Sequence, residues 1–379
     1  MTTVPLSNSA SSDSLKSEEL DTRQTKINLK DLSPSQITEL LVQLGERPYR
    51  GSQIAAWLFN RGCLDFEDMT DISKSSKIKM AKYFSVSPLL NLVKDEADPE
   101  GARRLLWRLK DDLLVESVLL TEASHYTLCL STQVGCRMGC RFCRTGSLGL
   151  SRNLTQGEII DQIILTRQLI AQDEKDEFQL TNLVFMGMGE PLDNADNVLN
   201  SLDLINSPKY LAMSSKHISL STVGLIPQIK RLSELGGLKG GLTISLGSAN
   251  DELRSQLMPI NKKWPLSNLK EALADFPLPK GRRLTFAYVL LEGLNDSPAQ
   301  ARELSVFLTG LKTKINLIPF NPWPGAPFKR PAEKTIEAFR DILLDKHHTV
   351  LIRNTKGASV SAACGLLVAD QTPLSPALA

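Results

Sequence analysis

The sequence predicts an α/β protein, a partial (β/α)6 barrel preceded by a small helical domain and a linking β-hairpin. Three observations predict this fold. Strand-like and helix-like segments alternate strictly after residue 123, helical periodicity fills residues 26–90, and residues 91–122 contain a segment with period-two alternation. Strict alternation implies parallel strands joined by helical crossovers, which bring functional residues to the C-terminal strand ends.

The N-terminal part divides into a tail and a helical domain. Residues 1–25 are rich in Ser, Thr, Asp and Glu, and we expect them to form a disordered tail. Residues 26–90 contain "SPSQITELLVQLG" and "GSQIAAWLFNRG", in which apolar residues recur three or four apart and Gly ends each run. Clustered basic residues in this domain fit either a solvated helix face or an accessory RNA-binding surface. They are Lys74, Lys77, Lys79 and Lys82.

The hairpin and the barrel follow. In the linker, residues 91–122, the segment "LLWRLKDDLLVESVLL" predicts a hairpin with "KDD" at its turn. The core barrel spans residues 123–357, and residues 358–379 form a C-terminal loop and tail that carry Cys364. The expected barrel strands are "YTLCLST", "NLVFMG", "HISLST", "GLTISLG", "RLTFAYVLL", "INLIPF" and "HTVLIR". The expected helices lie at residues 155–172, 195–205, 226–236, 266–276, 297–311 and 333–344.

Composition excludes some classes of protein. Lys and Arg total 44 against 42 Asp and Glu, and a net charge of +2 does not by itself indicate nucleic-acid binding. Apolar runs stay far below the roughly 20 residues of a membrane span, and no secretory signal is evident, so we expect a cytoplasmic protein without a membrane partner. We therefore expect its six cysteines to be metal ligands or reactive thiols rather than partners in structural disulfide bonds.

Three cysteines share one short segment. Cys136, Cys140 and Cys143 follow a C-x3-C-x2-C spacing, which lets three thiolates converge on zinc or on an iron–sulfur cluster. A structural zinc needs a fourth ligand, and the nearest His is His125, eleven residues upstream. A four-iron cluster held by three cysteines leaves one iron open to a substrate. The cluster is the favoured interpretation, and a zinc site remains the alternative.

The motif and its surroundings resemble those of the radical SAM superfamily. There the open iron binds S-adenosylmethionine, and a glycine-rich motif like "GMGEP" lies beside it. Further stretches resemble the RlmN family of radical SAM RNA methyltransferases, of RlmN/Cfr type, over about residues 31–370. They are "CLSTQVGC", "GMGEPLDN", "LSTVG", "DELRSQLMPIN", "NLIPFNP" and "AACG".

This resemblance implies a specific reaction. Family members methylate carbon 2 of adenosine in 23S ribosomal RNA and transfer RNA, with one 4Fe–4S cluster per chain and two molecules of S-adenosylmethionine. Carbon 2 is electron-poor, so the methyl group first moves to a cysteine thiolate and then adds to adenine as a radical. RNA is the implied partner, with an external reductant such as flavodoxin or ferredoxin.

The resemblance also assigns residues. Cys364 carries the methyl group, Cys129 resolves the product through a transient disulfide with Cys364, and Glu116 accepts a proton. Cys63 matches no motif and is expected to be structural. The cluster ligands are Cys136, Cys140 and Cys143. The implied S-adenosylmethionine contacts are Gly189, Glu190, Ser221, Ser245, Leu246, Gly247 and Asn321.

Two positions differ from the residues that are usual in the family. Gly247 stands where His is usual, and Ser361 stands where an acid is usual, which affects cofactor contact and RNA fit respectively. Two alternative functions remain open. A sister family with the same cysteines methylates carbon 8 of adenosine, and a zinc-stabilised RNA-binding module would be no enzyme at all.

Overall fold

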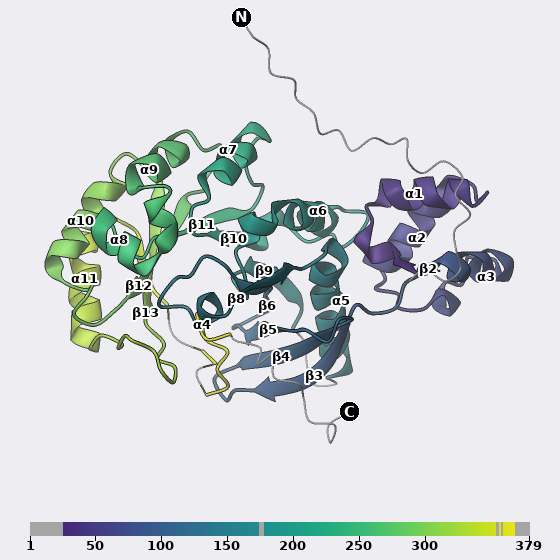
Figure 1. Cartoon of the computed structure of the whole chain (residues 1–379), viewed down its shortest axis with the longest axis horizontal. Coiled ribbons are helices and arrows are strands. Elements are labelled where there is room, and N and C mark those ends of the chain that lie inside the picture. The colour runs from purple at the N-terminus through teal and green to yellow at the C-terminus, as the bar shows by residue number, and fades with distance from the viewer. Residues whose placement is uncertain (1–25, 174–177, 354–355, 358, 368–379) are drawn as a thin grey trace, which may run out of the picture.

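A computed structural model describes residues 26–173, 178–353, 356–357 and 359–367. The tail predicted for residues 1–25 and the last twelve residues lie outside the described residues. Within them, the largest sheet has ten strands in the order β14-β13-β12-β11-β10-β9-β6-β5-β4-β3. The strand order follows the chain from β9 to β14, as expected for successive βα units (Figure 1). The predicted fold class is confirmed.

The parallel part of the sheet forms the partial barrel. Each strand pairs in parallel with the next, for example with Thr285 opposite Lys314, and the register shifts between Tyr126 and Thr127 of β6. The strands are β6 (Tyr126–Cys129), β9 (Leu180–Phe185), β10 (Ile218–Thr222), β11 (Gly241–Ser245), β12 (Leu284–Leu290), β13 (Thr313–Pro319) and β14 (Val350–Ile352). Each lies within a predicted strand or overlaps it closely. β6 is buried along its whole length, whereas β10 alternates buried and half-buried residues.

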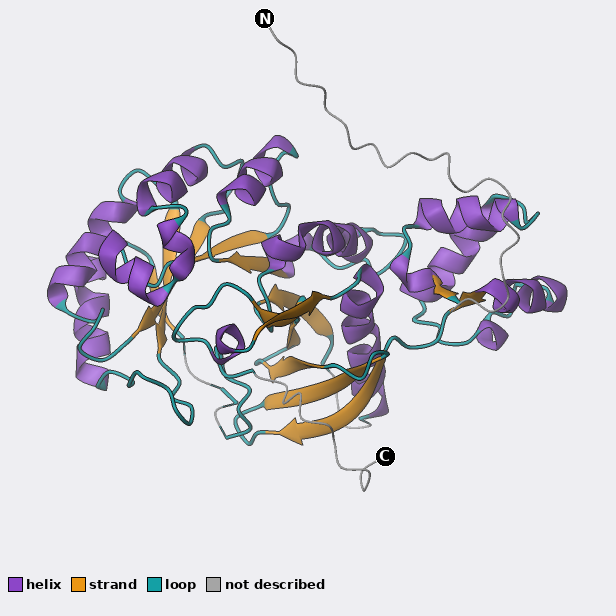
Figure 2. Cartoon of the chain, viewed as in Figure 1, coloured by secondary structure: helices purple, strands orange, loops and turns teal. Residues whose placement is uncertain are grey.

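Helices connect these strands along the outside of the barrel (Figure 2). The predicted helices all form, and capping boxes fix two of their starts, at Thr155 with Glu158 and at Ser297 with Gln300. The crossover helices are α5 (Gln156–Gln172), α6 (Ala195–Asn206), α7 (Ile226–Glu234), α9 (Leu266–Ala274), α10 (Pro298–Leu308) and α11 (Glu333–Asp345). A short helix, α8 (Asp251–Leu257), was not predicted and lies in the loop after β11.

The linker contributes antiparallel strands to the same sheet. The predicted hairpin is formed by β4 (Ala102–Leu109) and β5 (Leu114–Thr121), and β5 pairs with β6 of the barrel. An additional strand, β3 (Leu90–Ala97), was missed because it is an edge strand with mostly exposed, charged side chains. A separate antiparallel pair, β7 (Gln133–Cys136) and β8 (Gly149–Asn153), flanks the cysteine loop and its short helix α4 (Arg144–Ser147).

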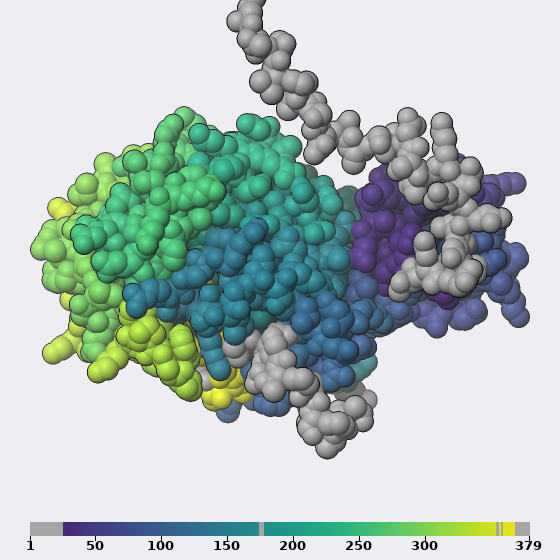
Figure 3. Space-filling model, in the orientation of Figure 1, coloured from purple at the N-terminus to yellow at the C-terminus, as the bar shows by residue number. Residues whose placement is uncertain are grey.

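The N-terminal helices form a lobe beside the barrel (Figure 3). They are α1 (Pro34–Gln43), α2 (Tyr49–Phe59) and α3 (Lys74–Tyr83), closed by a short parallel pair of β1 (Ile27–Asn28) with β2 (Phe84–Ser85). In the part of the chain that the structure describes, no helix is both long enough and apolar enough to cross a membrane.

A buried ion pair joins this lobe to the barrel. Lys30 Nζ lies 2.6 and 2.8 Å from the two carboxylate oxygens of Asp161 on α5, and both side chains are fully buried. Asp161 also accepts a hydrogen bond from the Leu89 backbone N–H at 2.7 Å. Burial raises the pKa of Asp161, and the charge of Lys30 opposes that rise. The pair fixes where the helical domain sits relative to α5.

We predict that Lys30→Met destabilises the protein by about 3 kcal/mol, because it leaves the buried carboxylate of Asp161 without its cation. Urea unfolding measures this change. The exposed Lys74 provides the control variant Lys74→Met, which should change stability little. Lys30→Met combined with Asp161→Asn should recover most of the loss, since the amide still accepts from Leu89. Equal stability of the two single variants would contradict the prediction.

Candidate active site

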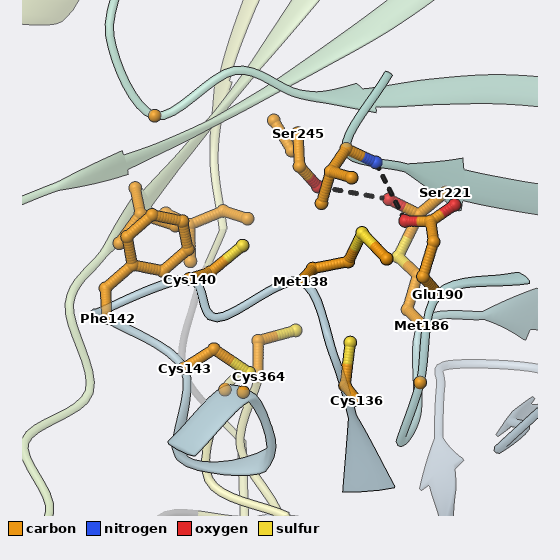
Figure 4. Close-up of a pocket in the computed structure, with 18 of the residues that line it drawn as sticks. Cys136, Met138, Cys140, Phe142, Cys143, Met186, Glu190, Ser221, Ser245 and Cys364 are labelled. Carbon is orange, nitrogen blue, oxygen red and sulfur yellow. Dashed lines mark hydrogen bonds between the residues drawn. The ribbon is translucent and has the colours of Figure 1, made fainter. Parts of the chain in front are cut away.

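A cavity lies at the C-terminal ends of the parallel strands (Figure 4). Its walls come from the cysteine loop, from strands β9 to β13, from the loops after β9, β10, β11 and β13, and from the C-terminal segment. This is the face on which parallel barrels place their sites. The predicted residues that line it are Cys136, Cys140, Cys143, Gly189, Glu190, Ser221, Ser245, Gly247, Asn321 and Cys364.

The cysteine loop is fixed by backbone hydrogen bonds at both ends. The N–H of Arg141 donates to Leu257 O at 2.9 Å, and the N–H of Arg144 donates to Gly365 O at 2.8 Å. Gly139 has φ +64°, which permits the turn between the first two cysteines. The loop is therefore held between α8 and the C-terminal segment.

Cys136 and Cys140 are buried and Cys143 is half-buried, and desolvation favours the neutral form of all three thiols. Burial raises the pKa of Cys136 to about 12 and also raises the pKa values of Cys140 and Cys143. Nearby thiols add to the rise for Cys140, since like charges disfavour each other. A bound metal centre would have to displace these protons, as thiolate ligation does elsewhere.

The donor set fits an iron–sulfur cluster better than zinc. Among the described residues, no three His, Cys, Asp or Glu side chains are placed to hold one metal ion. Zinc needs its ligands within about 2.3 Å of one point, whereas a cluster takes each thiolate on a different iron. The three thiols surround one cavity (Figure 4), as the cluster requires.

Gly189 and Glu190 bring the loop after β9 close to β7. Gly189 has φ +102°, and a Cβ there would lie 2.6 Å from the Cβ of Gln133, so a larger residue does not fit. The carboxylate of Glu190 accepts from the backbone N–H groups of Leu192 at 3.1 Å and Val223 at 2.9 Å. Burial raises the pKa of Glu190 to about 7. The carboxylate thus joins two cavity loops.

Polar groups from the neighbouring strands complete the wall. Ser221 on β10 and Ser245 on β11 share a hydrogen bond of 3.3 Å, and Asn321 Nδ2 donates to the carbonyl of Cys364 at 3.1 Å. Leu246 is buried and does not line the cavity. Its N–H donates to Ala287 O at 2.9 Å, so any contribution to the site goes through the backbone.

The structure leaves little room for a side chain at Gly247, the first of the two positions expected to depart from the family's usual sequence. Its φ is +72°, and a Cβ there would lie 2.7 Å from Met258 Sδ. Its carbonyl accepts from Asn295 Nδ2 at 2.8 Å. A His at this position would require Met258 to move, so Gly247 approaches the cavity as bare backbone.

A second cavity adjoins the first. It is lined by Cys129 from β6, by the hydrophobic face of β5 and by Arg353 and Lys356 near the C-terminus. Cys364 lines both cavities, and Figure 4 shows it next to Cys143. The other residues shared by the two cavities are Met186, Gly187, Ile318 and Asn321.

Charge links the groups of the second cavity. The thiolate charge of Cys364 raises the pKa of Arg353, with a smaller contribution from Cys129. Burial raises the pKa of Cys129 to about 12, and the charge of Cys364 adds to that rise. All six cysteines are free, so no disulfide joins Cys129 and Cys364 in this structure.

Glu116 lies apart from the other predicted residues. It is buried on β5, and its carboxylate accepts from Arg104 Nη1 at 3.1 Å. Arg104 in turn pairs with Glu96. Among the described residues that line the two cavities, Glu116 is absent. A role at the adenine would need the Arg104 contact to open.

Two arginines were missed by the sequence analysis. Arg254 is almost fully buried and donates to Leu246 O, Val223 O and Asn261 Oδ1 at 2.6 to 2.9 Å, which ties the loops after β10 and β11 together. Its only sequence signal was the stretch "DELRSQLMPIN". Arg353 follows the last strand, and nothing in its local pattern separates it from a surface residue.

Comparison with known proteins places this site in a family. The model of the ribosomal RNA large subunit methyltransferase N-terminal domain matches residues 27–86, and the radical SAM superfamily model matches residues 130–304. A dual-specificity RNA methyltransferase RlmN from Desulfotalea psychrophila is 40% identical over 363 residues, which cover 94% of this chain and 98% of the relative. Another from Anaeromyxobacter dehalogenans is 42% identical over 351 residues, covering 92% and 94%.

A comparison with solved structures leads to the same family. The crystal structure of a radical SAM methyltransferase from Sphaerobacter thermophilus superposes with a TM-score of 0.84 at 36% identity, and the match covers 91% of this chain and 100% of that one. Together with the thiols that surround the first cavity, these matches show that the chain belongs to the RlmN family of radical SAM RNA methyltransferases.

Proposed function

We propose that this protein methylates carbon 2 of adenosine in RNA, with 23S ribosomal RNA and transfer RNA as its substrates. The observation that carries the proposal is the position of Cys364, a residue that lines both the cavity of the three cysteines and the cavity of Cys129. A thiol that carries a methyl group between a donor site and an acceptor base must reach both. The dual specificity in the names of the relatives supports two RNA classes.

Cofactor roles follow from the first cavity. Cys136, Cys140 and Cys143 would hold a 4Fe–4S cluster, which with S-adenosylmethionine supplies the radical chemistry that an electron-poor carbon requires. Around it, Ser221, Ser245 and Asn321 offer polar side chains. Gly189, Leu246 and Gly247 would contribute backbone N–H and C=O groups. Glu190, already bonded to two N–H groups, has remaining lone pairs for the methionyl ammonium.

The second cavity would carry the thiol chemistry. Cys364 accepts the methyl group through its sulfur, and Arg353 lines the same cavity as Cys364. Cys129 then attacks the sulfur of Cys364 to release the product, which leaves a transient disulfide. Glu116 is the proton acceptor once it leaves Arg104. We place this activity in the cytoplasm, with a flavodoxin or ferredoxin as electron donor.

RNA would dock through the N-terminal lobe. Lys74, Lys79 and Lys82 on α3 are exposed, whereas Lys77 is buried and donates to Glu67 O at 2.8 Å. Just after α2, the guanidinium of Arg61 stacks 3.9 Å from the ring centroid of Trp57 on that helix. Exposed cations can bind RNA phosphates. Because Lys77 is buried, we no longer include it among the lysines that the sequence suggested for RNA binding.

We predict that methyl-labelled S-adenosylmethionine labels Cys364 of the reconstituted enzyme before RNA is added. Mass spectrometry of the digested protein locates the label, and nucleoside analysis of treated RNA should then find 2-methyladenosine. Product methylated at carbon 8 would instead assign the protein to the sister activity.

Two variants distinguish the role of Cys364 as methyl carrier from the role of the loop cysteines as cluster ligands. Cys364→Ala should keep iron and sulfide and lose the label, while Cys140→Ala should lose the cluster absorbance. A colourless wild-type protein prepared without oxygen would support the zinc-stabilised module. Loss of iron from Cys364→Ala would make Cys364 a ligand and reject its role as carrier.

We predict that Arg353→Gln slows methyl transfer to Cys364 by about tenfold, because the second cavity loses the cation that lines it together with Cys364. Single-turnover labelling measures this rate. Arg340→Gln, at a more exposed cation on α11, is the matched control. Arg353→Lys, which keeps the charge, should recover most of the rate. Labelling of Arg353→Gln at the wild-type rate would contradict the prediction.

We predict that Lys74→Gln with Lys79→Gln weakens RNA binding and lowers the slope of log affinity against log salt by about 1.5. Filter binding at several salt concentrations gives the slope. Lys334→Gln with Lys346→Gln removes the same charge from exposed positions on and after α11 and should leave the slope nearly unchanged. Equal slopes for both pairs would rule out docking through α3.

A further inference from the structure

A third cavity opens at the other end of the barrel. It has a volume of about 540 Å³ and lies at the N-terminal ends of the parallel strands, opposite the two cavities that contain the cysteines. Its wall includes Lys216 and His217 just before β10, Arg282 and Arg283 just before β12, and Lys314 on β13. The sequence analysis assigned no role to any of these residues.

The lining is polar where a barrel interior is usually apolar. Parallel barrels normally fill this space with packed branched side chains. Here the strand residues around the cavity include Asn182, Ser219, Thr285 and Lys314. Because side chains alternate along a strand, Ser219 and Thr285 face the same side as Ser221 and Ala287 of the first cavity. The two cavities therefore lie at opposite ends of one barrel interior.

The charge of this cavity is unbalanced. Four full positive charges line it, from Lys216, Arg282, Arg283 and Lys314, and none of its described lining residues is acidic. Within the described residues, Arg283 donates to Thr349 Oγ1 at 2.7 Å, and no ion pair connects any of the four to a carboxylate. By contrast, Arg103, Arg104 and Arg152 are each paired with two carboxylates.

Like charges around one hollow repel each other, and a bound anion converts that repulsion into attraction. Arginine presents a planar fork that matches two phosphate oxygens, and lysine adds a compact charge. The hydroxyl of Thr285 adds a neutral group that can donate a hydrogen bond, whereas Ser219 Oγ already lies 3.2 Å from Thr243 Oγ1 and Asn182 Nδ2 lies 3.0 Å from His125 Nε2. Four cations suit a multiply charged phosphate better than a single carboxylate.

We propose that this cavity is a binding site for a phosphate group, separate from the methylation site. A phosphate there would bridge the starts of β10, β12 and β13 and hold this end of the barrel together. The group could come from a free polyphosphate or from the backbone of bound RNA. Both sources share the same chemistry, and the experiment distinguishes them.

The test compares two variants of the full-length protein with equal charge change. Arg282→Gln with Lys314→Gln removes two cations from the cavity. Lys280→Gln with Lys312→Gln removes two exposed cations that flank them in sequence and do not line it. Inorganic pyrophosphate is the probe, with calorimetry and the melting temperature as measurements, and substrate RNA affinity against salt forms the second arm.

We expect pyrophosphate to bind the wild type and the flanking variant equally and to raise their melting temperatures. It should bind the cavity variant at least tenfold more weakly. If pyrophosphate binds none of them but the cavity variant alone loses RNA affinity and salt slope, the phosphate belongs to RNA. Equal behaviour of the two variants in both arms overturns the proposal. Should the double cavity variant not fold, Lys314→Gln against Lys312→Gln repeats the comparison.

Discussion

The parallel strands do not close into a full barrel, because β6, the first of them, pairs with β5 of the linker, and β14, the last, is an edge of the sheet. Residues from both of these strands, Cys129 and Leu351, line the second cavity, and the C-terminal segment covers it. That segment is anchored to the cysteine loop by Arg144 N–H to Gly365 O and by Thr145 Oγ1 to Leu367 O. Cys364 lies between these anchors and Asn321. A closed barrel would leave no place from which one thiol could face both cavities.

Burial raises the pKa values of thiols in both cavities. The loop thiols are held neutral by desolvation, and a metal centre that binds them would have to take their protons. The second cavity differs because the cations Arg353 and Lys356 line it together with Cys129 and Cys364. No Lys or Arg is found among the described residues that line the first cavity. Lys30 and Asp161 are buried elsewhere in the protein, and there each charge is balanced by the opposite charge of its partner.

The sequence predicted the barrel well because its strands are short apolar runs and its helices begin with recognisable caps. It missed β3, whose exposed edge has no alternating pattern, and the β7–β8 pair, whose strands are too short to show one. Motif residues gathered at one cavity because parallel strands end on one face. Arg353, Arg254 and the basic cavity were not foreseen, because each depends on which distant segments meet. Glu116 was placed on the right strand, but its ion pair with Arg104 could not be deduced from spacing.

Gly247 is held as bare backbone by its neighbours in the first cavity. The space that a side chain would need at this position is filled by Met258, whose Sδ would lie 2.7 Å from an added Cβ. Met258 is fixed by its own N–H to Arg254 O at 2.7 Å, and Arg254 in turn holds Leu246 O at 2.9 Å. The backbone of residues 246 and 247 is therefore positioned from both sides. Gly247 thus presents a rigid backbone edge to the cavity, so the shape of this wall, rather than a titratable side chain, would govern any binding there.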